Sequence, residues 1–344
     1  MSALPEKFRT CYPFRENWLE LPDGKMHYVD TLADAAGAGE NGNGTTTGGV
    51  TGGTTGGKIF NADEGDADGA PPPPAADGSD GRTVLLLHGN PTWSFLWRDL
   101  MRSLDFAGLR CVAPDLLGMG LSEKPDKFFR LADRIAHVEQ LVARLGLKKF
   151  HLVVHDWGGA IGMGVAGAAP ERVGKIVLTN TAAFPSRHIP RRIALLRNPL
   201  GAFLIRAFNL FALPAIFMAT SKGMTATVRG GFLWPYDSWC SRAAIARFVR
   251  DIPMKPSDPS YATLEGVGAS LERLKGKPVL IAWGGMDFCF DETFLREWHK
   301  RFPDARVRFY HNAGHYVLED AGDEIIPEIR DFLAGATGEA EDAG

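Results

Sequence analysis

One carboxylate stands where the chain turns sharply between two elements. In the stretch VVHDWGG, residues 153–159, an apolar run ends at Asp156, and two glycines follow Trp157. This pattern has the form of the strand–turn–helix motif G-x-S-x-G, with Asp156 at the position of the nucleophile. A carboxylate is ionised at neutral pH, so Asp156 could attack carbon without the help of a base. The position also suits an N-cap aspartate, which is the structural alternative.

Two later segments supply partners for such a nucleophile. Asp287 follows the apolar segment 277–285, and His315 ends the segment 305–315. The order nucleophile, acid, histidine is that of the α/β-hydrolases, which carry the acid and the histidine on loops after late strands. Asp287 would then hold the tautomer of the His315 imidazole, and His315 would activate water.

Two side chains with N–H donors, Asn90 and Trp157, stand close in sequence to the expected oxyanion N–H and to the expected nucleophile. The segment HGNP, residues 88–91, follows an apolar strand at the place where an oxyanion N–H should arise, and Trp157 follows the nucleophile directly. The amide NH₂ and the indole N–H suit a halide or a developing carboxylate. The alternatives are a turn role for Asn90 and core packing for Trp157. We expect no cofactor and no metal, because the four scattered cysteines form no CxxC pair.

The elements that must position these residues alternate between strand and helix. Apolar strands that are buried on both faces and separated by helices indicate a doubly wound, mostly parallel sheet. A helical, aromatic and Arg-rich region, which we expect to cap the carboxyl edge of the sheet, interrupts the alternation. The predicted strands are 83–89, 109–115, 149–156, 173–181, 277–285 and 305–315.

The chain is accordingly divided around one core. A Gly-, Thr-, Pro- and Ala-rich insert cannot bury enough apolar surface to fold, so we expect it to be disordered, like the tail. The predicted divisions are an N-terminal hairpin of the hydrolase domain at 1–32, the insert at 33–82, the first part of the core at 83–183, the helical cap at 184–261, the second part of the core at 262–335 and the tail at 336–344.

Composition argues against several partners. A net charge of −3 over 344 residues without a basic stripe argues against nucleic acid. The N-terminus lacks an apolar signal region, and Arg206, Asn209 and Pro214 interrupt the apolar stretch 199–220, so no integral membrane segment is expected. We therefore expect a cytoplasmic protein with a small-molecule substrate. The apolar, Arg-rich cap is compatible with a homo-oligomer or with contacts to pathway enzymes.

Four segments resemble the haloalkane dehalogenase-like branch of the α/β-hydrolases, namely HGNPTWSFLWR, VVHDWGG, WGGMDFCF and HNAGHYVLED. The resemblance covers about 83–334 and the hairpin, and it implies an α/β-hydrolase fold with an inserted helical cap domain. It also implies roles for five residues: Asp156 as nucleophile, His315 as base, Asp287 as acid, and Asn90 with Trp157 as the pair that holds a leaving halide. A second Trp from the cap is a feature of some members, and Trp234 and Trp239 are candidates by residue type alone.

Three further stretches are similar to the β-lactone decarboxylases of bacterial long-chain olefin biosynthesis and to a sister subgroup of dehalogenases. They are LTNTAAFP, WPYDSWCSRAAIARFVRDIPMKP and HYVLEDAGDEIIPEIRDFL. The first resemblance implies that Asp156 opens a cis-3,4-dialkyl β-lactone, with loss of carbon dioxide and formation of a cis-alkene. The second implies that a haloalkane is hydrolysed through an alkyl-enzyme ester. We expect the decarboxylase, with the dehalogenase as the alternative.

Two more distant alternatives are an epoxide hydrolase and a non-catalytic, hydrolase-like binding module. The epoxide hydrolases use two cap tyrosines, for which this chain offers Tyr236 and Tyr261. A binding module would be expected to lack part of the catalytic set, and none is missing here.

Five other polar residues near these segments are given no part in the chemistry. Asp115 is expected to hold a turn, His88 and His155 to hold backbone, and His311 to lie inside the last strand. Asn180 stands where one dehalogenase subgroup keeps its acid, but an amide cannot ionise.

Overall fold

The computed structural model describes residues 4–32 and 78–335, so the predicted tail and nearly all of the predicted insert lie outside the described residues. Its centre is one sheet whose apolar strands are buried on both faces. The strands are β1 (Asn17–Leu21), β2 (Gly24–Asp30), β3 (Thr83–Leu87), β4 (Arg110–Pro114), β5 (Phe150–Asp156), β6 (Val173–Thr181), β7 (Val279–Gly284) and β8 (Arg306–Tyr310).

The order of the strands is β1-β2-β4-β3-β5-β6-β7-β8. β2 runs antiparallel to β1 and β4, whereas every neighbouring pair from β4 to β8 is parallel. The predicted doubly wound, mostly parallel sheet is thereby confirmed. One prediction is wrong at its end: β8 stops at Tyr310, so His311 lies just outside the strand and His315 on the loop that follows. The polar and small residues 311–314 have no apolar alternation to continue the strand.

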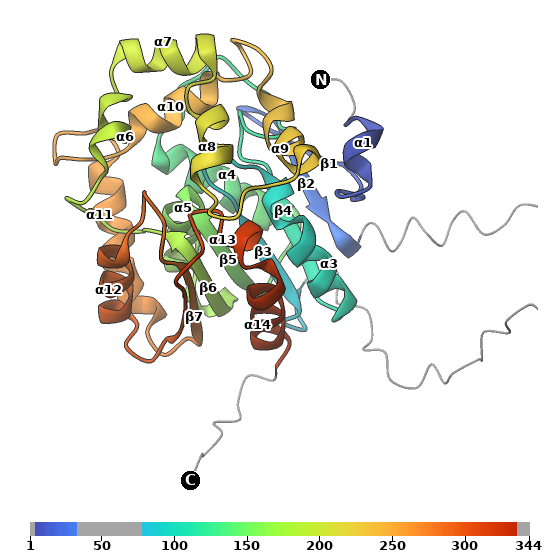
Figure 1. Ribbon diagram of the computed structural model, residues 1–344. Helices are drawn as coiled ribbons and strands as arrows, with labels where there is room; N and C mark the ends of the chain where they lie inside the picture. The colour runs from blue at the N-terminus through green and yellow to red at the C-terminus, as the bar shows by residue number, and fades with distance from the viewer. Residues whose placement is uncertain (1–3, 33–77, 336–344) are drawn as a thin grey trace, which may run out of the picture.

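Helices cover both faces of this sheet (Figure 1). α3 packs against α14 on one face, while α4 and α11 pack around α5 on the other. The helices outside the cap are α1 (Glu6–Arg9), α3 (Arg98–Phe106), α4 (Leu131–Arg144), α5 (Trp157–Ala168), α11 (Tyr261–Ser270), α12 (Glu292–Arg301), α13 (Val317–Asp320) and α14 (Gly322–Ala334).

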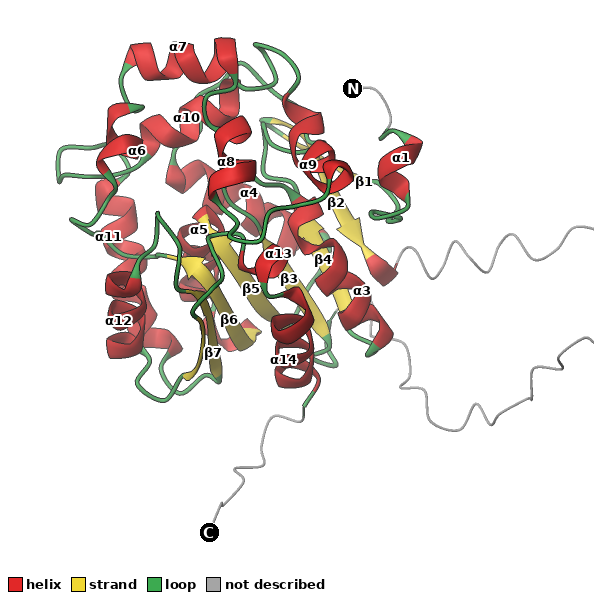
Figure 2. Cartoon of the chain, viewed as in Figure 1, coloured by secondary structure: helices red, strands yellow, loops and turns green. Residues whose placement is uncertain are grey.

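The segment between β6 and α11 is a layer of helices over the carboxyl ends of the strands (Figure 2). The carboxylate of Asp320 ties this layer to the loop before α13, because it accepts the backbone N–H of Ser221 at 2.8 Å and that of Gly314 at 2.7 Å. The segment between α8 and α9 is thus joined to the loop that carries His315. The helices of this layer are α6 (Arg191–Leu195), α7 (Pro199–Phe208), α8 (Ala212–Met218), α9 (Ala226–Leu233) and α10 (Ala243–Asp251).

Asp115 holds a turn beneath this layer, as predicted. It lies directly after β4 and is fully buried. Its carboxylate accepts the backbone N–H groups of Ser94 and Leu121 at 2.7 and 2.8 Å and a ring nitrogen of His27 at 2.9 Å. Burial alone raises the pKa of Asp115, but His27 and the backbone N–H groups outweigh it and leave the pKa below its usual value. The ionised carboxylate therefore stabilises the fold.

Replacement of Asp115 by Asn should lower the free energy of unfolding at neutral pH by about 2–4 kcal/mol, because two buried N–H groups lose a charged acceptor. A group whose pKa is lowered by folding contributes stability above its unfolded pKa of about 3.9, and loses it as the pH falls through the folded pKa. Urea denaturation should therefore show that the difference in the free energy of unfolding between wild type and variant becomes smaller below about pH 4. The exposed change Asp304→Asn serves as control. A difference that stays constant with pH would contradict this role.

Candidate active site

Asp156 lies at the junction of β5 and α5 in a left-handed conformation, with φ of +51°. Such a conformation is uncommon for a residue with a side chain, and it directs the carboxylate away from the strand. Two glycines make the close approach possible. A Cβ on Gly158 would lie 2.0 Å from the carbonyl oxygen of Leu87, and one on Gly89 would lie 2.0 Å from Asp156 Oδ1. The small residues after the turn therefore let the helix approach the sheet, and Gly89 leaves room for the carboxylate.

Backbone N–H groups hold the Asp156 carboxylate from below. The N–H of Asn90 donates to Oδ1 at 2.6 Å, and the N–H of Trp157 also stabilises the charged form. Burial nevertheless dominates and raises the pKa of Asp156, while His315 and these N–H groups act in the opposite direction. A carboxylate that has lost most of its water is a stronger nucleophile than a hydrated one.

His315 faces the second oxygen of Asp156. Its Nε2 lies 3.8 Å from Asp156 Oδ2, and its Nδ1 lies 2.7 Å from Asp287 Oδ2. Burial disfavours a charge on the imidazole, but the negative charges of Asp287 and Asp156 outweigh burial and raise the pKa of His315. The other oxygen of Asp287 accepts the backbone N–H of Cys289 at 2.6 Å. Three residues far apart in the chain thus meet in one buried set, in which Asp287 is hydrogen-bonded to His315 and His315 faces Asp156.

Asn180 belongs to this set, although the sequence assigned it no role. Its side-chain NH₂ donates to Asp287 Oδ2 at 2.9 Å, the oxygen that also receives His315 Nδ1. Its carbonyl oxygen accepts the N–H of Gly284 at 2.8 Å, so Asn180 joins the ends of β6 and β7. The sequence places Asn180 at the end of one strand and Asp287 after the next predicted strand, and this placement could have predicted a contact between them. Asn180 positions Asp287 and does not face the cavity.

The histidines expected to hold backbone do so. Nε2 of His88 accepts the N–H of Leu116 at 3.0 Å, so its Nδ1 donates to the carbonyl of Gly89 at 2.8 Å. His155 contacts the carbonyl oxygen of His315 through Nε2 at 2.9 Å. These two rings fix the loops that carry Asn90 and His315.

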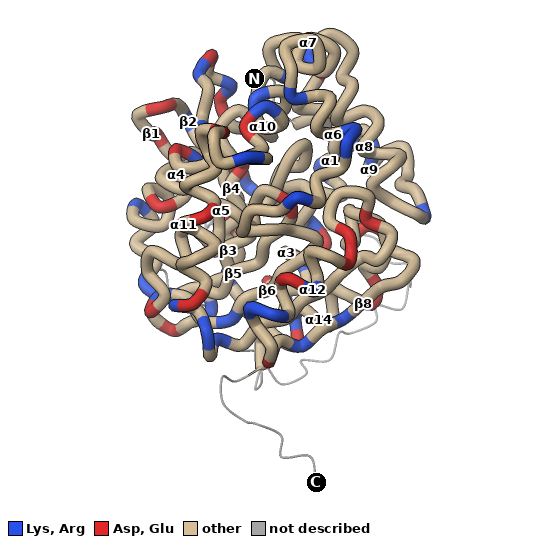
Figure 3. Tube along the Cα trace, turned by 90° about the vertical axis from the view of Figure 1, so that its left-hand side faces the viewer, with Lys and Arg blue, Asp and Glu red and all other residues tan. Residues whose placement is uncertain are grey.

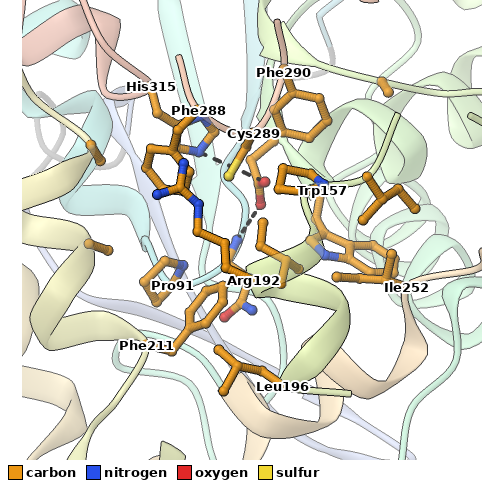
Figure 4. Close-up of a pocket in the computed structure, with 18 of the residues that line it drawn as sticks. Pro91, Trp157, Arg192, Leu196, Phe211, Ile252, Phe288, Cys289, Phe290 and His315 are labelled. Carbon is orange, nitrogen blue, oxygen red and sulfur yellow. Dashed lines mark hydrogen bonds and ion pairs between the residues drawn. The ribbon is translucent and has the colours of Figure 1, made fainter. Parts of the chain in front are cut away.

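A cavity of about 230 Å³ is lined by Asp156 and His315 on one side and by cap residues on the other (Figure 4). Asp156, His315 and Arg192 are the charged side chains among its described lining. Its other walls are mostly apolar; they include Leu196, Phe211, Ile252, Phe288 and Phe290, several of which come from the cap. The space suits alkyl groups with one polar reacting centre.

Asn90 and Trp157 both line this cavity. The Asn90 amide NH₂ has one long contact, 3.4 Å to the carbonyl of Ile245, and retains a donor hydrogen. The ring of Trp157 packs edge-on against Phe248 at 5.3 Å, and no acceptor among the described residues takes its indole N–H. Both residues therefore combine a packing role with a free donor beside Asp156.

Neither of the two Trp candidates from the cap reaches this cavity. Trp239 is exposed and stacks with Arg206, and Trp234 lies outside the lining. The two tyrosines considered for an epoxide hydrolase are also elsewhere: Tyr236 is buried and bonds the carbonyl of Thr92, and Tyr261 begins α11. Tyr316, which the sequence analysis overlooked, does line the cavity, next to His315.

Comparisons with known proteins agree with this fold. The profile of the alpha/beta hydrolase fold family matches residues 82–214. A cis-3-alkyl-4-alkyloxetan-2-one decarboxylase of Xanthomonas campestris is 41% identical over 268 residues, which cover 74% of this chain and 89% of the relative. Haloalkane dehalogenase 2 of Mycobacterium tuberculosis is 29% identical over 323 residues, which cover 92% of this chain and 94% of the relative.

Solved structures show the same architecture. The haloalkane dehalogenase DbeA from Bradyrhizobium elkani has a TM-score of 0.73 at 22% identity, over 94% of this chain and 98% of that chain. The predicted α/β-hydrolase fold is confirmed. The chain is an enzyme that belongs to the α/β-hydrolase family that contains the cis-3-alkyl-4-alkyloxetan-2-one decarboxylases and the haloalkane dehalogenases.

Proposed function

We propose that this enzyme is a decarboxylase of cis-3-alkyl-4-alkyl β-lactones, with Asp156 as its nucleophile. The observation that carries the proposal is a desolvated carboxylate on a tight turn, at the end of an apolar cavity and 3.8 Å from His315 Nε2. The Xanthomonas relative named for this reaction supports the choice of substrate. Alkyl chains on both ring carbons match the apolar walls that the core and the cap contribute.

In the first step Asp156 attacks C4, the ring carbon that carries the lactone oxygen. The C4–O bond breaks and its electron pair stays on oxygen, which yields a carboxylate on C3 and an ester between C4 and Asp156. The strained four-membered ring drives this opening. The free donors of Asn90 and Trp157 stabilise the new carboxylate, as they would a halide.

In the second step the bond between C3 and the carboxylate carbon breaks, and its electrons form the C3=C4 double bond. Carbon dioxide leaves, and the ester oxygen returns to Asp156 as a carboxylate. Attack from the rear places that oxygen opposite the carboxylate, so an anti fragmentation converts a cis lactone into a cis alkene. The sequence consumes no water, and the imidazolium form of His315, which its raised pKa favours, stabilises the returning charge.

The second candidate is a haloalkane dehalogenase. The two free donors beside Asp156 favour it, because they form a site for a leaving halide. In that reaction the first step is the same displacement at a saturated carbon, but neutral His315 then takes a proton from water, which attacks the ester carbonyl of Asp156. The two reactions therefore differ in whether a water oxygen enters Asp156.

The domain boundaries and the location form part of the same proposal. We place the cap at 184–261 between two parts of the core, 83–183 and 262–335, with the hairpin of 1–32 completing the core. We also place the enzyme in the cytoplasm. Association into a homo-oligomer or with enzymes that supply the lactone would suit a poorly soluble substrate.

Turnover in H₂¹⁸O separates the two reactions. With a cis-dialkyl β-lactone we expect alkene and carbon dioxide to form without ¹⁸O in the peptide that contains Asp156, as measured by mass spectrometry after digestion. Hydrolysis of a 1-bromoalkane would instead label that carboxylate. The Asp156→Asn variant should lose all turnover, because an amide is a very poor nucleophile. Label incorporated with the lactone, absence of alkene, or an active Asp156→Asn variant would contradict the decarboxylase.

The His315→Gln variant tests which step needs the imidazole. With 1-bromoalkane the variant should stop after one displacement and keep the alkyl group on Asp156, because no base activates water. Intact-mass spectra should show the adduct, and the double variant His315→Gln/Asp156→Asn should show none. With the lactone the single variant should form alkene more slowly but through repeated turnovers, since that route uses no water. Unmodified protein after exposure to a bromoalkane that wild type consumes would refute the ester.

A further inference from the structure

The outer surface of the cap is apolar to an unusual degree. Among the described residues, nine of the twelve exposed large apolar side chains lie between residues 195 and 239. Single exposed apolar residues are common on soluble proteins, but a concentration of them marks an interaction surface. We call the exposed large apolar side chains of α7, α8 and the segment between them the cap face: Leu200, Phe203, Phe208, Leu210, Leu213, Phe217 and Met218.

The lining of the active-site cavity includes residues of the cap face. Leu210 belongs to the face and also lines the cavity, and its neighbour Met218 is 44% exposed and lines the cavity too. Half-buried Phe211 and Pro214 continue the lining inward from the same segment. Apolar side chains therefore continue from the cap face into the lining of the cavity.

The cap segment that carries this apolar surface is rich in basic side chains. Residues 184–261 carry eleven Lys and Arg but three Asp and no Glu, so the remaining residues hold 27 of the 38 basic and 38 of the 41 acidic side chains. Two of the three acids are already neutralised, Asp251 by Arg130 at 2.8 Å and Asp258 by Arg197 at 3.0 Å. The cap is thus strongly positive on a chain whose net charge is negative.

The basic residues next to the face are not engaged in ion pairs. The Arg206 guanidinium lies over the Trp239 ring at 4.1 Å, and that of Arg229 lies 5.7 Å from the Phe217 ring. In the part of the chain that the structure describes, neither has a carboxylate within ion-pair distance, nor has the exposed Arg191 on α6. In Figure 3, α7 is almost wholly tan, with one blue segment. Arg206 and Arg229 donate to backbone carbonyls, so they keep their net positive charge. Apolar side chains bordered by cations without a carboxylate partner have the composition of a surface that binds anionic lipid.

We propose that the cap face docks on the surface of an anionic lipid bilayer, with its aromatic and Leu side chains at the boundary of the acyl chains and the arginines on the phosphates. Docking opens the cavity towards the lipid, so a long-chain substrate enters from the bilayer. The docking itself does not depend on the proposed reaction. Only the inference that substrate enters from the bilayer rests on the proposed function.

The helices are suited to lie on a bilayer. No single described helix is long and apolar enough to cross a membrane. α7 and α8 together are long and apolar enough, but the pair is bent by 79° at the break between them. With ten and seven residues they extend about 15 and 10 Å, against a hydrocarbon core of about 30 Å. A protein partner that bound the face would leave the arginines of the cap without a counter-charge unless that partner were acidic. Lipid phosphates supply the counter-charge.

Vesicle sedimentation without substrate tests the docking. Wild type should sediment with vesicles of phosphatidylcholine and phosphatidylglycerol, less with phosphatidylcholine alone, and less as salt is added. The variant Phe203→Ser/Phe217→Ser should bind at least tenfold more weakly, because these rings lie on the cap face and outside the cavity lining. The matched control is Phe106→Ser, which removes an exposed ring from α3, outside the cap. This variant should bind like wild type.

Arg191→Glu should weaken binding to the anionic vesicles, whereas Arg144→Glu, an exposed change on α4, should not. Thermal melting shows whether each variant is folded. Failure of wild type to sediment, or equal binding by the Phe203→Ser/Phe217→Ser variant, would overturn the proposal. A wild-type dimer that this variant converts to a monomer, without vesicle binding, would assign the face to a second copy of the chain instead. None of these results depends on whether the lactone is turned over.

Discussion

A carboxylate deprived of water and held by backbone N–H groups is the feature on which this active site depends. Its N–H donors, at Asn90 and Trp157, come from a loop and a helix start that the parallel sheet brings together. The cost of burial is reflected in the raised pKa of Asp156, and the nearby imidazole limits that rise. As the nucleophile that we propose, Asp156 would be reactive because these groups favour its ionised form in a place from which water is largely excluded.

The sheet and the cap contribute different properties to this site. The strands and their following loops fix Asp156, Asp287 and His315 through short hydrogen bonds, so the reacting groups are rigidly placed. The cap adds apolar walls, a positive charge balance and an apolar outer face, but no residue of the catalytic set. In the function we propose, the core carries the reacting groups, whereas the cap governs the choice and entry of substrate.

Much of this arrangement was predictable from local sequence. Apolar runs with sharp ends located the strands, and motif spacing identified Asp156, Asp287 and His315, because parallel strands bring their ends to one edge. The roles of Asn180 and Tyr316 were missed, since both depend on contacts between segments distant in sequence. The place of the Trp side chains in the cap could not be predicted either, because short helices broken by prolines have no periodic pattern that fixes their packing.

Asn180 lies near the end of β6 and donates to Asp287 on the loop after the adjacent strand β7, and this has an evolutionary consequence. A charged and a neutral side chain of nearly the same shape meet here beside one imidazole nitrogen. If Asn180 became Asp and Asp287 became Asn, the negative charge would move from the end of one strand to the end of its neighbour. The backbone would not have to change. Lineages of this fold could therefore relocate their acid in small steps without ever rebuilding the nucleophile or its histidine.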